Sequence, residues 1–291
     1  MKSVIAIDVG GTTMKGGLVA EDGRLLHEER RPTPRADGPE RVIAEISRFA
    51  AGLQALAASP VAVGLAVPGL VTATHAVYSA AIGWRDVPKA AFTATELPVA
   101  LGHDVRAAGE AELAFGGGDG EVLYLPIGTG IAGAVVLGGV PYGGAGGWAG
   151  QIGHIPVRPD GLACSCGQRG CLGAYASASA VARAYGVESA ARVVEAAAAG
   201  EPRAVRIWEQ AVEALAVALA TYTLLLDPRR IVIGGGLSLA GEHLLAPLRE
   251  RLAARLTFRA APELAASTLG TRAGLLGAGL LGWRYIAAVT T

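Results

Sequence analysis

Three cysteines and one histidine lie close together in a glycine-rich stretch of the chain. Cys164, Cys166 and Cys171 follow His154 in the segment GQIGHIPVRPDGLACSCGQRGCLG. One imidazole and three thiolates form a closed tetrahedral site with no position left for water, which is typical of structural zinc. Buried free thiols are the alternative, but the crowding of the cysteines favours metal ligation. The sequence therefore predicts a structural Zn²⁺ site at these four residues.

A carboxylate stands where a predicted strand gives way to a predicted helix. Asp104 follows the strand 99–103 and precedes the helix 105–115. It could serve only as the helix N-cap. Phosphoryl transfer to an alcohol, however, needs a carboxylate that accepts the hydroxyl proton and orients the nucleophile. Asp104 is the predicted general base, and its neighbour His103 either contacts the substrate or packs.

Three glycine turns each follow a strand rich in β-branched residues, at 10–11, 128–130 and 234–236. Backbone N–H groups in such turns can approach phosphates, and Asp8 is placed to hold Mg²⁺ or its water shell. An ordinary glycine hairpin is the alternative for any single turn. Together the turns predict an ATP site, and none matches the phosphate loop GxxxxGK[ST] or a clear dinucleotide fingerprint. The residues assigned to it are Asp8, Gly10, Gly11, Thr12, Lys15, Gly128, Thr129, Gly130, Gly234, Gly235 and Gly236.

Composition narrows the possible partners. The 291 residues carry a net charge of zero, and only 17% are charged. No broad field would attract nucleic acid or anionic lipid, so a small molecule is the expected partner. The apolar run 214–226 is short and closed by Asp227 and Pro228, and the N-terminus lacks the apolar centre of a signal peptide. A cytoplasmic protein is expected.

Periodicity indicates an α/β chain with two lobes that share a cleft. The hairpin around 128–130 echoes the one around 10–13, which suggests an ancient duplication. A long irregular segment, 141–171, needs something other than a core to hold it, and zinc could do so. Strands are predicted at 4–9, 17–20, 25–30, 61–67, 99–103, 121–127, 131–137 and 231–233, and helices at 39–59, 105–115, 175–185, 188–199, 202–226, 241–258 and from 272.

These motifs together resemble the ROK family (repressor, open reading frame, kinase) of bacterial sugar kinases. The resemblance rests on DxGGTxxxxG, HDVRAA, GTG, GxIGH followed by CxCGxxGC, and the late GGG, over residues 4 to about 280. It implies an actin-like, hexokinase-type fold that closes on ATP–Mg²⁺ and a hexose. A smaller lobe of 1–104 plus 273–291 and a larger lobe of 105–272, with the zinc loop and a dimerisation surface, are expected. A homodimer or dimer of dimers follows from the same resemblance.

The resemblance also implies residue roles. The segment 8–12 and the turn 128–130 would contact the phosphates, and the turn 234–236 would lie near the adenosine. Asp104 would be the base, and His154 would both bind zinc and position sugar hydroxyls. Gly69, His103, Asp104, Gln151 and His154 are the predicted substrate contacts. The family's regulators carry a winged helix ahead of this region, and none is expected here.

Four positions depart from the family pattern. His103, Gln151 and Gly173 stand where the family usually has Asn, Glu and Glu, and Ala81 replaces a polar residue ahead of Gly83-Trp84. A glutamine amide can donate a hydrogen bond where a carboxylate cannot, and glycine offers only space. We therefore expect a polyol other than glucose, such as a C7 cyclitol or a modified hexose, phosphorylated on its exocyclic primary hydroxyl. An ordinary glucokinase, an N-acetylhexosamine kinase and a catalytically idle sugar sensor are the alternatives.

Overall fold

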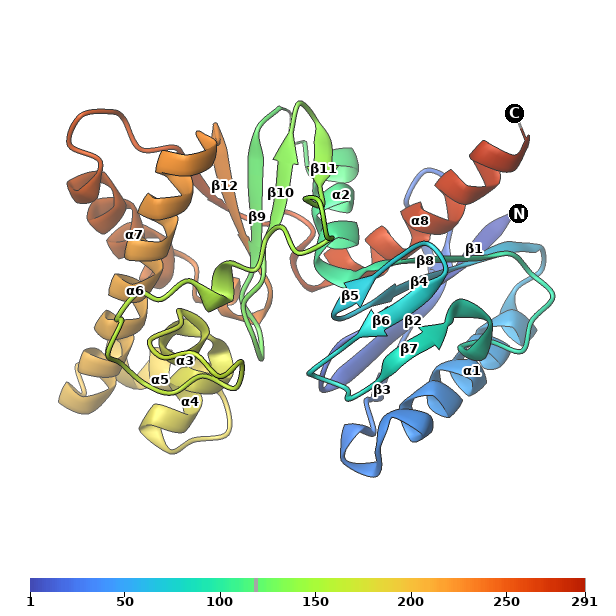
Figure 1. Cartoon of the computed structure of the whole chain (residues 1–291), viewed down its shortest axis with the longest axis horizontal. Helices are drawn as coiled ribbons and strands as arrows, with labels where there is room; N and C mark the ends of the chain where they lie inside the picture. The colour runs from blue at the N-terminus through green and yellow to red at the C-terminus, as the bar shows by residue number, and fades with distance from the viewer. Residues whose placement is uncertain (118–119, 291) are drawn as a thin grey trace. The chain divides into compact units, whose positions relative to one another are not determined.

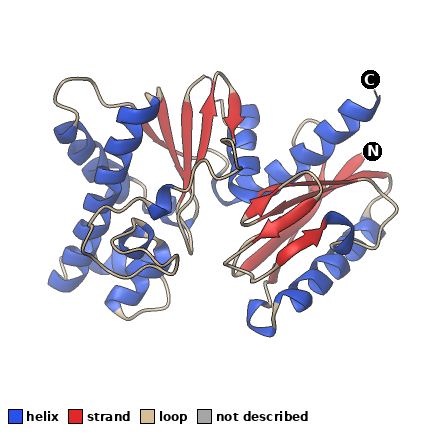
Figure 2. Ribbon diagram, in the orientation of Figure 1, coloured by secondary structure: helices blue, strands red, loops and turns tan. Residues whose placement is uncertain are grey.

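A computed structural model describes residues 1–117 and 120–290, and it divides into two compact units. Unit 1 comprises residues 1–117, 144–148 and 272–291, and unit 2 comprises 118–143 and 149–271. Positions 118, 119 and 291, which fall inside the predicted lobes, lie outside the described residues. Each unit has its own sheet and its own buried core (Figures 1 and 2).

Unit 1 is built on a five-stranded mixed sheet of order β3-β2-β1-β4-β8. The first three strands are an antiparallel meander, and β4 and β8 continue parallel to β1. β1 is buried along its whole length because helices cover both faces of the sheet. The strands are β1 (Ser3–Val9), β2 (Thr13–Val19), β3 (Leu25–Pro32), β4 (Pro60–Val67) and β8 (Val99–His103).

Helices α1 (Pro39–Leu56) and α8 (Ala273–Thr290) cover opposite faces of this sheet. Side chains alternate along a strand, and two adjacent glycines of β2 show which helix each face meets. A Cβ on Gly16 would strike Phe49 of α1, whereas a Cβ on Gly17 would touch Leu275 of α8. Helix α2 (Asp104–Phe115) packs on α8, where Gly277 allows a backbone approach that any Cβ would block. A small sheet of β5 (Leu70–Val71), β6 (His75–Tyr78) and β7 (Arg85–Pro88) completes unit 1.

Unit 2 repeats the same sheet topology. Its order is β11-β10-β9-β12-β13, with an antiparallel half followed by two parallel strands. The repeat agrees with the duplication suggested by the two glycine hairpins. The strands are β9 (Val122–Pro126), β10 (Ala134–Leu137), β11 (Val140–Tyr142), β12 (Arg230–Gly234) and β13 (Glu263–Ala266).

Helix α6 (Pro202–Leu226) runs through the core of unit 2 and buries Trp208, Leu215 and Leu219. It is the one helix among the described residues that is long and apolar enough to cross a membrane by length and composition. Half of its most apolar window is buried, and core helices of soluble proteins pass the same test. Around it lie α3 (Gly173–Ala176), α4 (Ala178–Tyr185), α5 (Ala190–Ala198) and α7 (Glu242–Arg255).

The α/β class predicted from periodicity is confirmed, and the major elements lie close to their expected positions. One lobe boundary differs. The prediction assigned the helix after Asp104 to the larger lobe, but α2 belongs to unit 1, which extends to residue 117. The reason is the close packing of α2 on α8 through Gly277. The segment 144–148 also belongs to unit 1, although the chain on both sides of it belongs to unit 2.

Candidate active site

The first glycine turn joins β1 to β2 and presents Asp8 at the end of a buried strand. Lys15 Nζ lies 3.3 Å from Asp8 Oδ2, and the backbone N–H of Gly10 donates to the Thr13 carbonyl at 3.1 Å. Gly11 has open space where a side chain would stand, as a phosphate-binding turn requires. Burial raises the pKa of Asp8, the Lys15 ammonium opposes that rise, and the Asp104 carboxylate adds to it. The two carboxylates therefore act on one another within unit 1.

Asp104 is the first residue of α2, at the carboxyl end of β8. The N-cap is not Asp104 but His103, whose Nδ1 accepts a hydrogen bond from the Arg106 backbone N–H at 3.3 Å. Asp104 Oδ1 accepts from the neighbouring Val105 N–H, at 2.8 Å. The alternative that Asp104 merely caps the helix is wrong, because its neighbour does so.

Burial sets the protonation states of this pair. It raises the pKa of Asp104 to about 6, against the opposing effects of the Val105 N–H and the Arg106 guanidinium. Burial, assisted by the Arg106 charge, lowers the pKa of His103 to about 3, so its imidazole is neutral near pH 7. With Nδ1 accepting a hydrogen bond, the proton is assigned to Nε2. A carboxylate with a pKa near 6 is suited to accept a hydroxyl proton.

Arg106, which the sequence motifs did not single out, ties α2 to the segment 144–148. Its Nη1 donates to the Gly147 carbonyl at 3.0 Å. Gly147 has a φ of 78°, which favours glycine, and a Cβ there would press on Leu70. The motif HDVRAA contained this arginine, but only tertiary structure reveals its partner. Gly274 was missed as well: a Cβ at this position of α8 would overlap the Asp8 carboxylate.

The two glycine turns of unit 2 lie together. The Ile127 N–H donates to the Gly234 carbonyl, and the Leu237 N–H donates to the Ile127 carbonyl, both at 3.0 Å. Since β9 and β12 are parallel neighbours, the turns that follow them lie at the same edge of the sheet. Gly128, Gly130 and Gly236 have open space where a Cβ would stand. A ligand at this edge of the sheet could accept hydrogen bonds from backbone N–H groups of both turns, as the sequence predicted for ATP.

The second turn is further anchored to helix α4. The Ala178 N–H donates to the Gly128 carbonyl at 2.8 Å, and Ser179 Oγ donates to the Thr129 carbonyl at 2.6 Å. Ser177 caps α4 by accepting from the Ala180 N–H. These serines were not predicted, although the run ASASA at the start of a helical stretch is an N-cap signal.

The predicted metal ligands converge in unit 2. One donor atom from each of His154, Cys164, Cys166 and Cys171 lies within 4.8 Å of the other three. Cys166 Sγ and Cys171 Sγ are 3.7 Å apart, and so are Cys164 Sγ and His154 Nδ1. A tetrahedron with Zn–S bonds of about 2.3 Å has edges of about 3.8 Å. The donor set and its spacing therefore fit zinc.

Backbone hydrogen bonds help to hold the metal loop, whose Ile155 and Val157 also pack against the core of unit 2. Cys171 pairs with Pro156 in an antiparallel bridge, and the Gly167 N–H donates to the Cys164 carbonyl to close a tight turn. Burial and the neighbouring sulfurs raise the pKa of Cys171 to about 12. A dication among the sulfurs would reverse that effect, because thiolates are the form that binds metal.

The predicted substrate contacts fall in both units. Gly69 in unit 1 has a φ of 107°, and a Cβ there would overlap the Tyr78 carbonyl. In unit 2, Gln151 immediately precedes the short 3₁₀ helix Ile152–His154. Gly173 begins α3, and a Cβ there would lie 3.3 Å from the Gly153 carbonyl. Gly153 lies between Gln151 and His154 in the chain and packs against Gly173, so it brings these three residues close together.

Comparison with known proteins adds the following similarities. The sequence pattern of the ROK family matches residues 4–284. A glucokinase of Halalkalibacterium halodurans is 34% identical over 95% of this chain and 94% of its own length. An N-acetylmannosamine kinase of Escherichia coli is 31% identical over 96% of this chain and 98% of its own. The ROK family glucokinase from Streptomyces griseus, solved with glucose and AMPPNP, superimposes with a TM-score of 0.87 at 31% identity, covering 97% of this chain and 99% of that one.

Proposed function

The chain belongs to the ROK family and is an ATP-dependent carbohydrate kinase, and we propose that Asp104 is its general base. Its fold is the actin-like ATPase fold of hexokinase-type kinases. The single observation that carries the proposal is the Asp104 carboxylate at the start of α2. His103 caps this helix in place of Asp104, and burial raises the pKa of Asp104 to about 6. In this role Asp104 accepts the proton of the attacking hydroxyl while that oxygen forms a bond to the γ-phosphorus of ATP. The bond from this phosphorus to the β,γ-bridging oxygen breaks, and ADP leaves with that oxygen.

The remaining roles follow from charge and geometry. Asp8, beside Lys15, is proposed to hold Mg²⁺ or its water shell, and the turns 10–12 and 128–130 to donate backbone N–H groups to the phosphates. Gly234–Gly236 would lie at the adenosine. When bound, Mg²⁺ neutralises charge on the transferring phosphoryl group.

Zinc is proposed to be structural and not catalytic. The four protein ligands would complete a tetrahedron around it and leave no open position for a reacting oxygen. His154 would bind it through Nδ1, which lies toward Cys164, and keep its other ring nitrogen for a sugar hydroxyl. Gln151 precedes the short helix that contains Gly153, and Gly173 lies against the Gly153 carbonyl, so both would face the same side of the sugar.

For the acceptor, the coarse conclusion is a hexose-like sugar, because the relatives are kinases of glucose and N-acetylmannosamine. We propose further that the ring is altered, as in a modified hexose or a C7 cyclitol, and is phosphorylated on its exocyclic primary hydroxyl. His103 supports this, since its Nε2–H is a single donor where an asparagine amide would both donate and accept. Gln151 and Gly173 each remove a carboxylate acceptor from the predicted sugar side.

A panel of acceptors with ATP and Mg²⁺ tests this choice. It should contain glucose, N-acetylmannosamine, deoxy and keto hexoses, and a C7 cyclitol, with ADP release as the measurement. The proposal predicts a higher kcat/KM for an altered ring than for glucose. Faster turnover of glucose or N-acetylmannosamine than of every altered ring would establish the ordinary kinase instead. Absence of ADP release with any acceptor would favour the idle sensor.

Cytoplasmic location and a homodimer joined through unit 2 are also proposed. The first rests on composition and the half-buried α6, and the second on the family resemblance. Light scattering on the purified protein at several concentrations would measure the assembly, and a monomer at every concentration would reject the dimer.

A further inference from the structure

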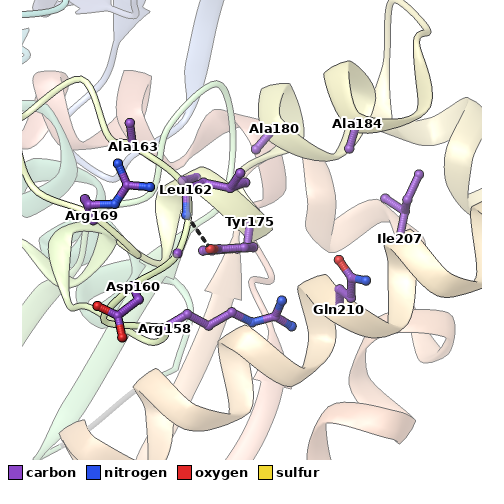
Figure 3. Close-up of a pocket in the computed structure, with 12 residues that line it drawn as sticks. Arg158, Asp160, Leu162, Ala163, Arg169, Tyr175, Ala180, Ala184, Ile207 and Gln210 are labelled. Atoms are coloured by element: carbon purple, nitrogen blue, oxygen red, sulfur yellow. Dashed lines mark hydrogen bonds between the residues drawn. The ribbon is translucent and has the colours of Figure 1, made fainter.

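The outer side of the metal loop in unit 2 borders a hollow of about 500 Å³ (Figure 3). This volume is in the range of small-molecule sites. The hollow contains none of the residues assigned above to ATP, sugar or metal. One wall is the loop itself, and the other is formed by α4 and α6. The residues that line it are Arg158, Asp160, Gly161, Leu162, Ala163, Arg169, Ala174, Tyr175, Ala180, Ala184, Ile207 and Gln210.

The loop wall is preformed. Tyr175 Oη accepts a hydrogen bond from the Leu162 N–H at 2.7 Å and so pins the loop to α3. The Arg158 guanidinium lies 4.8 Å from the centre of the Tyr175 ring, a cation–π geometry that holds the arginine in place. The Arg158 carbonyl accepts from the Gly161 N–H at 2.8 Å, which closes the turn between them. A ligand would meet fixed groups, with little ordering required on binding.

The two arginines of the lining have no carboxylate partner among the described residues. Within the described part of the chain, neither the Arg158 nor the Arg169 guanidinium forms an ion pair or a side-chain hydrogen bond. In Figure 3 the Arg158 guanidinium extends toward Gln210, while the Asp160 carboxylate points away from both. The lining carries two guanidinium groups and one carboxylate, so its net charge is positive. Guanidinium groups in such an arrangement favour carboxylate or phosphate oxygens.

The opposite wall is apolar. Ala180 and Ala184 of α4 and Ile207 of α6 present methyl groups, and Figure 3 shows them on the α4 and α6 side, away from the loop arginines. A bare inorganic ion would leave these groups uncovered. We propose that the hollow binds a small organic anion, with its carboxylate or phosphate between Arg158 and Gln210 and its carbon body on Ala180, Ala184 and Ile207. The site lies outside the proposed active site and would serve an effector, not the sugar.

The Ile207 δ1 methyl is a local reporter of this site. The experiment titrates methyl-labelled protein with phenyl phosphate, benzoate and neutral benzyl alcohol, and follows that signal by NMR. Saturating Mg²⁺–AMPPNP occupies the nucleotide site throughout. The Ile207 signal is assigned by its loss in Ile207→Leu. Benzoate and phenyl phosphate separate the two anion chemistries, because saturation by one alone identifies the preferred group.

The expected result is a saturable Ile207 shift with at least one anion and none with the alcohol. Arg158→Met, which keeps the aliphatic stem, should weaken binding about tenfold or more through loss of a charge-assisted hydrogen bond. Gln210→Leu, on the exposed side of α6, should also weaken it without touching the loop. Arg183→Met, an exposed arginine of α4 outside the hollow, is the matched control and should bind as the parent does.

Three results would overturn the proposal: no saturable shift with either anion, equal shifts with the alcohol, or unchanged affinity in both Arg158→Met and Gln210→Leu. If Arg158→Met fails to fold, Gln210→Leu still decides. None of these readings depends on catalytic turnover.

Discussion

His103 leaves the Asp104 carboxylate available for chemistry. An aspartate at a strand-to-helix junction ordinarily spends an oxygen on the first-turn N–H groups. Here the imidazole of His103 accepts from the Arg106 N–H, and the Asp104 carboxylate accepts from the adjacent Val105 N–H. Burial then raises the pKa of the carboxyl. A residue that departs from the family pattern thus supports the proposed base.

The pKa of Asp104 predicts the acid limb of the pH–rate profile. The base works only when ionised, so activity is lost as pH falls through its pKa, and burial has moved that pKa up to about 6. With the best acceptor, kcat/KM should therefore rise as pH increases and level off above pH 7. A profile that is flat down to the ordinary pKa of a solvent-exposed aspartate would contradict the assignment.

Between elements, the notable link is the one from α2 to the segment 144–148. This segment belongs to unit 1 while its flanking residues belong to unit 2. Arg106 holds it through the Gly147 carbonyl. Burial raises the pKa of Asp104, and the same guanidinium opposes that rise. One side chain therefore both positions the segment and affects the pKa of Asp104, the proposed base.

Loss of this link should be visible by hydrogen exchange. Arg106→Ala removes the bond to Gly147, so amides of residues 144–148 should exchange faster, by about fivefold for a bond worth about 1 kcal/mol. The midpoint of the pH–rate profile should also move up, because a cation near Asp104 is gone. Arg41→Ala, at an exposed arginine of α1, is the control. Unchanged exchange together with an unmoved midpoint would remove Arg106 from both roles.

Two glycines of the metal loop provide a matched pair. Gly167 and Gly170 have φ of 92° and 74°, but a Cβ on Gly170 would overlap the Arg158 carbonyl, whereas Gly167 faces open space. Gly167→Ala should cost only the backbone strain of about 1–2 kcal/mol. Gly170→Ala should cost more and should lower the zinc bound per chain. Equal melting temperatures and equal zinc content in the two variants would show that the loop tolerates displacement.

On the scale of the whole molecule, local sequence signals located most of what the structure contains. The Cys₃His cluster could be predicted because its ligands lie close in sequence, and α1 and α8 because their apolar periodicity or length is clear. The boundary of unit 1 could not be predicted, because it depends on the packing of α2 against α8, which is distant from α2 in the sequence. The same reason explains why the sequence did not predict the hydrogen bond from Arg106 to Gly147 or the close approach of Gly274 to Asp8. Long-range contacts leave no periodic trace in sequence.

Position-resolved phosphoryl transfer tests the central claim most directly. The parent protein and Asp104→Asn would each be incubated with Mg²⁺–ATP and the best acceptor of the panel, and the product analysed by ³¹P NMR. The account predicts one phosphate ester, on the exocyclic primary oxygen, and a kcat lower by about 10²–10⁴-fold in the variant with little change in KM. Undiminished kcat in Asp104→Asn, or a phosphate on a ring hydroxyl, would contradict it.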